Sequence, residues 1–284
     1  MLLQLAGRRD RVVEGQEASS RLLDELSQLA RCELTFPTFG LRPLDDILML
    51  RPGSYTILGA RTSEGKTSLA VDLARNNALA GLSVLYFSTE MRPEDLQRRQ
   101  VAYYTRIGFR ELCGRLDDEQ LHQVAEALGR IGEWPGSIDY IDGTVSLDRI
   151  RLEALSRQAQ GLLDLVIVDY VQKVRAPGER LYEQVTAVSR GLQSLARDYG
   201  IPIVAVSQLS RKAIGKDRPT KDDLRESGAQ EEDADAVLLL QRDPDHGQGV
   251  FRAVLWWVDK NRNGGLGEGA LMLDTVRFHF EEME

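Results

Sequence analysis

The sequence predicts an α/β protein whose central sheet is mostly parallel and flanked by helices. Short apolar runs alternate with amphipathic stretches along most of the chain. The run 165–168 (Leu-Val-Ile-Val) is apolar at every position, which a strand tolerates only when both of its faces are covered. The last forty residues differ, because their apolar runs have turn-rich connections and no helix between them. We therefore expect antiparallel edge strands at the C-terminal end.

Composition narrows the class of protein. Lys and Arg number 36 against 44 Asp and Glu, for a formal net charge of −8, which at first sight argues against a nucleic-acid binder. Cys32 and Cys113 are too few and too isolated for a disulfide framework. No apolar run reaches the ~20 residues that a membrane span needs. These features predict a cytoplasmic protein without a membrane partner.

The N-terminal region precedes the α/β pattern. Residues 1–16 are polar and are expected to form a loose arm, and 19–31 show a helical pattern. Its apolar face carries Leu22, Leu23, Leu26, Leu29 and Ala30. This helix either packs on its own domain or docks on a neighbouring subunit. We place the boundary between an arm with a linker helix (1–34) and the α/β domain (35–284).

Within the α/β domain, apolar runs and helical periodicity mark the elements. The expected strands cover 54–59, 83–88, 138–141, 165–169, 202–207, 236–240, 251–258, 270–273 and 276–280. The expected helices cover 67–79, 94–106, 118–130, 147–159 and 182–198.

A phosphate site is predicted in segment 57–68, where a strand runs into a loop ending Gly65-Lys66-Thr67 and a helix follows. The pattern is G-x4-G-K-[ST], except that Ala60 replaces the first Gly. Backbone N–H groups and a helix N-terminus can wrap a triphosphate there, with Lys66 on the β/γ oxygens and the Thr67 hydroxyl on Mg²⁺. The alternative is an ordinary Gly-Lys turn. The predicted nucleotide-binding residues are Ala60, Arg61, Thr62, Ser63, Glu64, Gly65, Lys66, Thr67 and Ser68.

Two acidic residues follow apolar strands. Asp169 ends the run 165–168, as the acid of a Walker B strand does, and its carboxylate can orient the Mg²⁺ shell. Glu90 lies just beyond 83–88 and can polarise an attacking water. The alternatives are an Asp that caps a turn and an ordinary surface Glu.

A basic loop follows the strand 202–207. Residues 211–225 carry six basic side chains against three acidic ones, although the whole chain is acidic. Such a loop can couple nucleotide state to a polyanion, tracking its backbone without sequence preference; alternatively it is merely solvated. The pair Trp256-Trp257 indicates edge packing or an interface rather than a base platform.

Six segments, taken together, resemble the motor domain of DnaB-type replicative helicases, in order from about residue 35 to 278. An Ala at the first P-loop position is usual in that family. The matching segments are 60–67, 88–91 (Ser-Thr-Glu-Met), 167–172 (Ile-Val-Asp-Tyr-Val-Gln), 202–211 (Pro-Ile-Val-Ala-Val-Ser-Gln-Leu-Ser-Arg), 223–228 (Asp-Leu-Arg-Glu-Ser-Gly) and 260–264 (Lys-Asn-Arg-Asn-Gly).

The resemblance implies a RecA-like P-loop NTPase core that assembles as a ring, usually a hexamer, with ATP and Mg²⁺ bound between subunits. Glu90 would be the catalytic carboxylate and Gln208 the sensor of the γ-phosphate. Lys260 and Arg262 would enter the neighbouring subunit's site, with Arg262 as an arginine finger. Alternatively, Gln208 satisfies the hydrogen bonds of a buried turn, and Lys260 and Arg262 belong to a solvated hairpin turn.

The resemblance also bears on DNA. Residues matching Arg225, Glu226 and Gly228 line the central channel in that family, and the basic loop adds charge beside them. The predicted DNA-binding residues are Arg211, Lys212, Lys216, Arg225, Glu226 and Gly228.

The function that this implies is an ATP-dependent DNA helicase. We expect a ring-forming homo-oligomer that moves 5′→3′ on single-stranded DNA and unwinds duplex in replication, with a primase or a helicase loader as further partners. We expect the family's primase-binding N-terminal domain to be missing, because only about 35 residues precede the motor. We expect a motor associated with the nucleoid, of the compact kind that a phage or mobile element encodes. Two alternatives stay open: a RecA-like repair or recombination ATPase, and a KaiC-like signalling protein that does not act on DNA.

Overall fold

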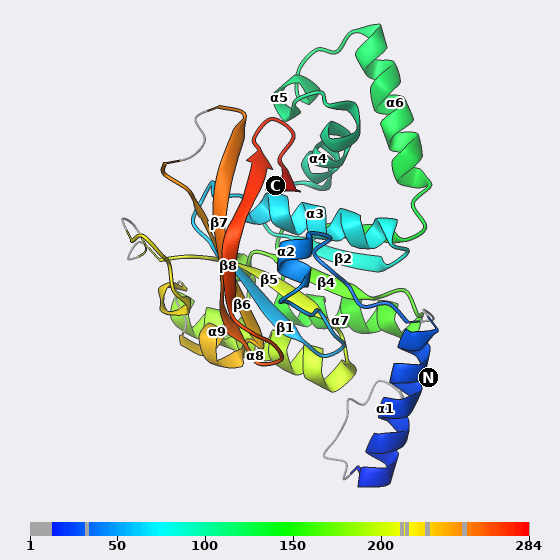
Figure 1. Ribbon diagram of the computed structural model, residues 1–284, viewed down its shortest axis with the longest axis vertical. Helices are drawn as coiled ribbons and strands as arrows, with labels where there is room; N and C mark the ends of the chain where they lie inside the picture. The colour runs from blue at the N-terminus through cyan, green and yellow to red at the C-terminus, as the bar shows by residue number, and fades with distance from the viewer. Residues whose placement is uncertain are drawn as a thin grey trace.

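The computed structural model describes residues 13–31, 34–210, 213, 216–224, 228–245 and 249–283. Within them, a nine-stranded sheet runs through the centre of the molecule in the order β3-β2-β4-β5-β1-β6-β7-β8-β9 (Figure 1). The strands from β3 to β6 in this order pair in parallel, and β7, β8 and β9 form an antiparallel meander at one edge. Both halves of the fold prediction are confirmed.

The elements follow the expected alternation of strand and helix. The strands are β1 (Tyr55–Ala60), β2 (Ser83–Ser88), β3 (Ser137–Asp142), β4 (Leu165–Asp169), β5 (Ile203–Gln208), β6 (Ala236–Arg242), β7 (Phe251–Asn261), β8 (Gly267–Asp274) and β9 (His279–Glu282). The helices are α1 (Gly15–Ala30), α2 (Arg42–Asp45), α3 (Lys66–Leu79), α4 (Pro93–Thr105), α5 (Phe109–Leu112), α6 (Asp118–Gly132), α7 (Leu147–Ala159), α8 (Leu181–Tyr199) and α9 (Gly228–Asp233), with short 3-10 turns η1 (Val171–Lys173) and η3 (Lys221–Asp223).

Two hydrophobic cores lie on the two faces of the sheet. In β4, Leu165 and Ile167 pack into the core that contains α3, whereas Val166 and Val168 pack into the core that contains α7 and α8. Successive side chains of a strand point to opposite faces, so a strand that is apolar at every position serves both cores. This explains the unbroken run 165–168.

The N-terminal helix differs from expectation in its start and in its packing. Helix α1 begins at Gly15, so the arm predicted over 1–16 is too long by two residues. None of its residues is buried, and Leu22, Leu23 and Leu26 are each more than half exposed. The helix projects from the body of the domain (Figure 1). Leu29, near the end of the helix, lines a pocket with Phe36 and Leu48. The rest of the leucine face does not pack on its own domain within the described residues.

Short elements account for the remaining differences. Helices α2, α5 and α9 have four to six residues each, too few to show periodicity in the sequence. The last strand begins at His279 rather than at 276, because the Asp274 carboxylate accepts the N–H groups of Val276 (2.9 Å) and Arg277 (3.0 Å) and closes a turn.

The tryptophan pair lies in β7, between β6 and β8. Trp256 is 3% exposed and Trp257 is 7% exposed, so both pack inside the fold. Along the described residues, no helix has the length and apolar character needed to cross a membrane.

Candidate nucleotide-binding site

The site begins at the loop between β1 and α3. Gly65 has φ +95° and stands at the N-cap of α3. A Cβ at this position would lie 2.7 Å from the Phe280 ring, so both the backbone and the space favour glycine. Helix α3 starts at Lys66, and its first N–H groups point into the loop, where they can receive an anion. The Arg61 N–H donates to Glu64 Oε2 at 3.1 Å and braces the loop.

Strand register brings the predicted acidic and polar residues to the same edge of the sheet. Ser88 pairs with Asp169 in the β2–β4 ladder, and Ala60 pairs with Gln208 in the β1–β5 ladder. Since these strands are parallel, their carboxyl ends meet at this edge, which is where ligands bind in open α/β sheets. Glu90 lies two residues beyond the end of β2 and reaches the same place.

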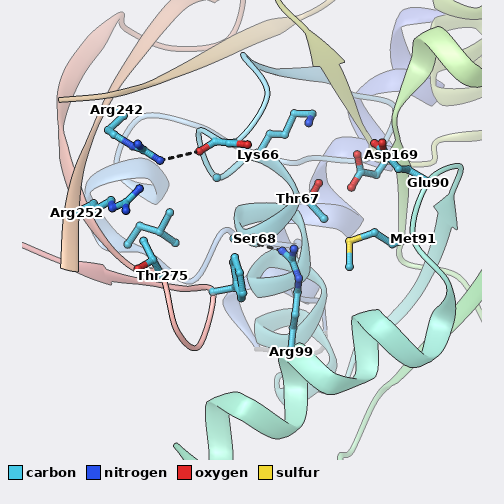
Figure 2. Close-up of a pocket in the computed structure, with 14 residues that line it drawn as sticks. Lys66, Thr67, Ser68, Glu90, Met91, Arg99, Asp169, Arg242, Arg252 and Thr275 are labelled. Atoms are coloured by element: carbon cyan, nitrogen blue, oxygen red, sulfur yellow. Dashed lines mark hydrogen bonds between the residues drawn. The ribbon is translucent and has the colours of Figure 1, made fainter. Parts of the chain in front are cut away.

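A pocket of about 390 Å³ lies at this edge (Figure 2). It brings together seven of the fourteen predicted phosphate, metal and catalytic residues. Those that line it are Ser63, Gly65, Lys66, Thr67, Ser68, Glu90 and Asp169. Ala60 is buried at the end of β1, and Ala60, Arg61, Thr62 and Glu64 do not line the pocket.

The carboxylate of Asp169 is held from two sides. It accepts hydrogen bonds from the hydroxyls of Thr67 and Tyr86, the latter at 3.0 Å to Oδ2. Burial raises the pKa of Asp169, while the charge of Lys66 and these hydrogen bonds lower it. A carboxylate and a hydroxyl oxygen side by side form the donor set that Mg²⁺ prefers. The residues present therefore fit a magnesium ion.

Three arginines that the sequence did not predict as site residues also line the pocket. Arg99 of α4 donates from Nη1 to Ser68 Oγ at 3.1 Å, and Arg242 at the end of β6 donates from Nη2 to the Ser63 carbonyl at 3.2 Å. Arg252 of β7 faces the same space (Figure 2). Together with Lys66 they gather four cationic side chains in an acidic protein, which favours a polyphosphate ligand.

These arginines are recognised as site residues only once the fold shows which way each side chain points. Arg98 and Arg99 are adjacent in the sequence, yet Arg98 forms an ion pair with Asp95 at 2.6 Å whereas Arg99 turns into the pocket. The two side chains point in different directions because adjacent residues of a helix lie on different faces. Arg242 and Arg252 reach the site through the β6–β7 pairing, for which the sequence offers no spacing signal.

Gln208 contacts the phosphate loop directly. Its Nε2 donates to Thr62 Oγ1 at 2.6 Å, and its backbone N–H donates to Gln172 Oε1 at 3.2 Å. Gln172 in turn donates to Ser207 Oγ at 2.9 Å. The side chain of Gln208 therefore links the end of β5 to the loop that precedes α3.

Lys260 and Arg262 do not reach the pocket of their own chain. β7 runs antiparallel to β6, and Lys260 pairs with Val237 near the start of β6, at the edge of the sheet opposite to the pocket. Arg262 donates from Nη1 to Asp235 Oδ1 at 3.0 Å and from Nη2 to the Glu232 carbonyl at 2.8 Å. Lys260 Nζ donates to the same carbonyl at 3.0 Å. Both basic side chains thus gather at the C-terminal end of α9.

The predicted DNA-binding residues fall partly outside the described residues: Arg211, Lys212, Arg225 and Glu226 do so. Lys216 forms an ion pair with Asp223 at 2.6 Å, and its side chain is 42% exposed. Lys216 lowers the pKa of Asp223 against the effect of burial. Gly228 is the first residue of α9.

The fold and the pocket define the class of protein: a P-loop NTPase domain of the RecA-like type. The family described as "DnaB-like helicase C terminal domain" matches residues 38–282. The chain therefore belongs to the DnaB-like helicase C-terminal domain family.

Curated relatives and solved structures agree with this assignment. The replicative DNA helicase DnaB of Pasteurella multocida is 32% identical over 267 residues, covering 87% of this chain and 56% of the relative. The protein of the same name from Haemophilus influenzae is 32% identical over 288 residues, covering 96% of this chain and 61% of the relative. The chain thus spans little more than half the length of these relatives.

Two solved structures share the fold. The ATPase domain of G40P has a TM-score of 0.84 at 25% identity, and the match covers 96% of this chain and 100% of that one. A DnaB-like replicative helicase, solved in a study of its interactions with primase, has a TM-score of 0.80 at 24% identity, covering 100% of this chain and 70% of that one.

Proposed function

We propose that this chain is the motor of an ATP-dependent DNA helicase: a ring-forming translocase that moves 5′→3′ on single-stranded DNA and unwinds duplex in replication. One observation carries the proposal. Lys66, Thr67, Glu90 and Asp169 meet in one pocket, while Arg262 lies at the opposite edge of the sheet. This separation supports a hydrolytic site shared between two subunits, in which one chain would supply the pocket and its neighbour would supply Arg262.

ATP is the proposed nucleotide and Mg²⁺ the proposed metal ion. Lys66 is buried at the N-terminus of α3, where its ammonium can contact the β- and γ-phosphates. Thr67 and Asp169 would hold Mg²⁺, which when bound neutralises charge on the phosphate oxygens. Arg99 adds a fixed cation beside Ser68, next to the first turn of α3.

Glu90 is the proposed catalytic carboxylate. Its side chain is 57% exposed and lines the pocket, and its Oε1 forms an ion pair with Lys173 Nζ at 3.7 Å. A carboxylate in this position can accept a proton from the attacking water. Gln208 is the proposed sensor, because its amide bonds Thr62 and can exchange that partner when the phosphate leaves.

Arg262 is the proposed finger for the neighbouring subunit, with Lys260 beside it. Its guanidinium would neutralise the charge that builds on the transferring phosphoryl group. In its own chain Arg262 binds Asp235 and the end of α9. Helix α9 begins at Gly228, the last residue of the segment predicted to contact DNA. One short helix thus connects the finger to that segment.

Single-stranded DNA is the proposed polymer substrate, bound by the loop residues Arg211, Lys212, Lys216, Arg225, Glu226 and Gly228. In the described part of this loop, the buried Asp223 (2% exposed) forms an ion pair with Lys216 and accepts the Thr220 N–H at 2.9 Å. These contacts fix the end of the loop to the fold. Around a ring axis the charge of several such loops would add along the path of the strand. A primase or a helicase loader is the proposed protein partner of the assembly.

Helix α1 is the proposed ring-holding element. Leu22, Leu23 and Leu26 are each more than half exposed, and burying them on a neighbouring subunit would remove apolar surface from water. Residues 1–34 would then be an arm with a linker helix, and 35–284 the motor domain.

Deleting residues 1–31 should reduce the ring to smaller species. The physical reason is the loss of the apolar area that Leu22, Leu23 and Leu26 would bury between subunits. Light scattering coupled to gel filtration measures the mass. A deletion variant that keeps the oligomer of the full chain would contradict this role for α1.

The experiment that tests the proposed function is ATP hydrolysis with and without single-stranded DNA. Stimulation by DNA supports a translocase. Hydrolysis that DNA leaves unchanged would instead favour a signalling ATPase that does not act on DNA.

A further inference from the structure

Tyr86 is a buried tyrosine whose hydroxyl points at the proposed magnesium ligand. It lies on β2 and is 0% exposed, and its hydroxyl donates to Asp169 Oδ2 at 3.0 Å. In the β2–β4 ladder Tyr86 pairs with Ile167, two residues before Asp169. Residues two apart on a strand share a face, so the three side chains lie on the face that α3 covers.

The two oxygens of this hydrogen bond have complementary roles. The Tyr86 hydroxyl is the donor and Asp169 Oδ2 is the acceptor. Asp169 is 5% exposed and also accepts from Thr67. With a donor on each side, the carboxylate cannot rotate freely, and its orientation is set before any ligand arrives.

We propose that Tyr86 is a positioning residue for magnesium: its hydroxyl holds Oδ2 of Asp169 so that the rest of the carboxylate faces Thr67 and the metal. The inference rests on the proposed function and deepens it, because it assigns a residue of the core to the metal site. A phenylalanine would fill the same space between the sheet and α3. The hydroxyl is the part of the side chain that serves Asp169.

The test is nucleotide binding by Tyr86→Phe, measured by calorimetry with ATPγS in EDTA and in Mg²⁺. The affinity in EDTA should equal that of the wild type. The gain in affinity on adding Mg²⁺ should fall by about tenfold, the scale of one hydrogen bond to a charged group. Tyr140→Phe is the matched control, since it also removes a buried tyrosine hydroxyl, from the adjacent strand β3. The ring centroids of Tyr140 and Tyr86 lie 5.8 Å apart. Tyr140→Phe should keep the full magnesium gain.

A cycle with Asp169→Asn separates positioning from general damage to the fold. If Tyr86 acts through Asp169, adding Tyr86→Phe to Asp169→Asn should lower the affinity no further. An equal magnesium gain in Tyr86→Phe and the wild type would overturn the inference and leave the proposed function intact. A loss of affinity with and without metal, or on top of Asp169→Asn, would overturn it as well. A wild-type chain that binds no ATPγS at all would overturn both.

Discussion

Arg262→Ala should reduce ATP hydrolysis by about 10³–10⁵-fold while nucleotide binding persists. The finger neutralises charge that develops during phosphoryl transfer, so its loss affects the rate far more than the affinity. Steady-state ATPase assays and a binding titration measure the two effects. Arg157→Ala is a suitable control, because Arg157 also pairs with carboxylates, Asp139 at 3.0 Å and Glu153 at 2.6 Å, and lies outside the proposed site.

Mixing two inactive variants shows whether the finger acts across a subunit boundary. Lys66→Ala removes the phosphate-binding ammonium, and Arg262→Ala removes the finger. In a mixed ring, some interfaces join an intact phosphate loop to an intact finger, and those sites should hydrolyse ATP. Recovery of activity on mixing is the expected result. A mixture as inactive as its components, or an Arg262→Ala chain as active as the wild type, contradicts the shared site.

Glu90→Gln should lower kcat by about 10²–10⁴-fold and leave the KM for ATP little changed. The amide cannot accept the proton of the attacking water, yet it keeps the size of the side chain. Lys173→Ala serves as the control, because Lys173 is the ion partner of Glu90, and both side chains are about half exposed. Such a pair contributes little, so this variant should hydrolyse ATP nearly as the wild type does. A Glu90→Gln chain with normal kcat would remove Glu90 from the mechanism.

Much of the site could be predicted from the sequence, because its key residues follow strands. Asp169 is the last residue of β4, Glu90 lies two residues beyond β2, and Gly65 lies in the loop that follows β1. The carboxyl ends of these parallel strands meet at one edge of the sheet. The same local signal also yields the alternation of strands and helices. The strand order, with β1 between β5 and β6, comes from long-range pairing that leaves no local trace.

The residues that escaped prediction depend on geometry beyond their neighbours in the sequence. Arg99 and Arg98 have the same side chain, and only the phase of α4 sends one to Ser68 and the other to Asp95. In the sequence, Tyr86 looks like one more core position of β2. Its proposed role follows from the register with β4, which brings its hydroxyl to Asp169.

The proposed motor couples ATP hydrolysis to movement on single-stranded DNA. The most direct test is the steady-state rate of ATP hydrolysis by the wild-type chain, measured with and without single-stranded DNA of mixed sequence. DNA should clearly stimulate hydrolysis, and the stimulation should weaken as the salt concentration rises, because the proposed contacts are to phosphates. A hydrolysis rate that is the same with and without DNA at low salt would contradict the proposed coupling.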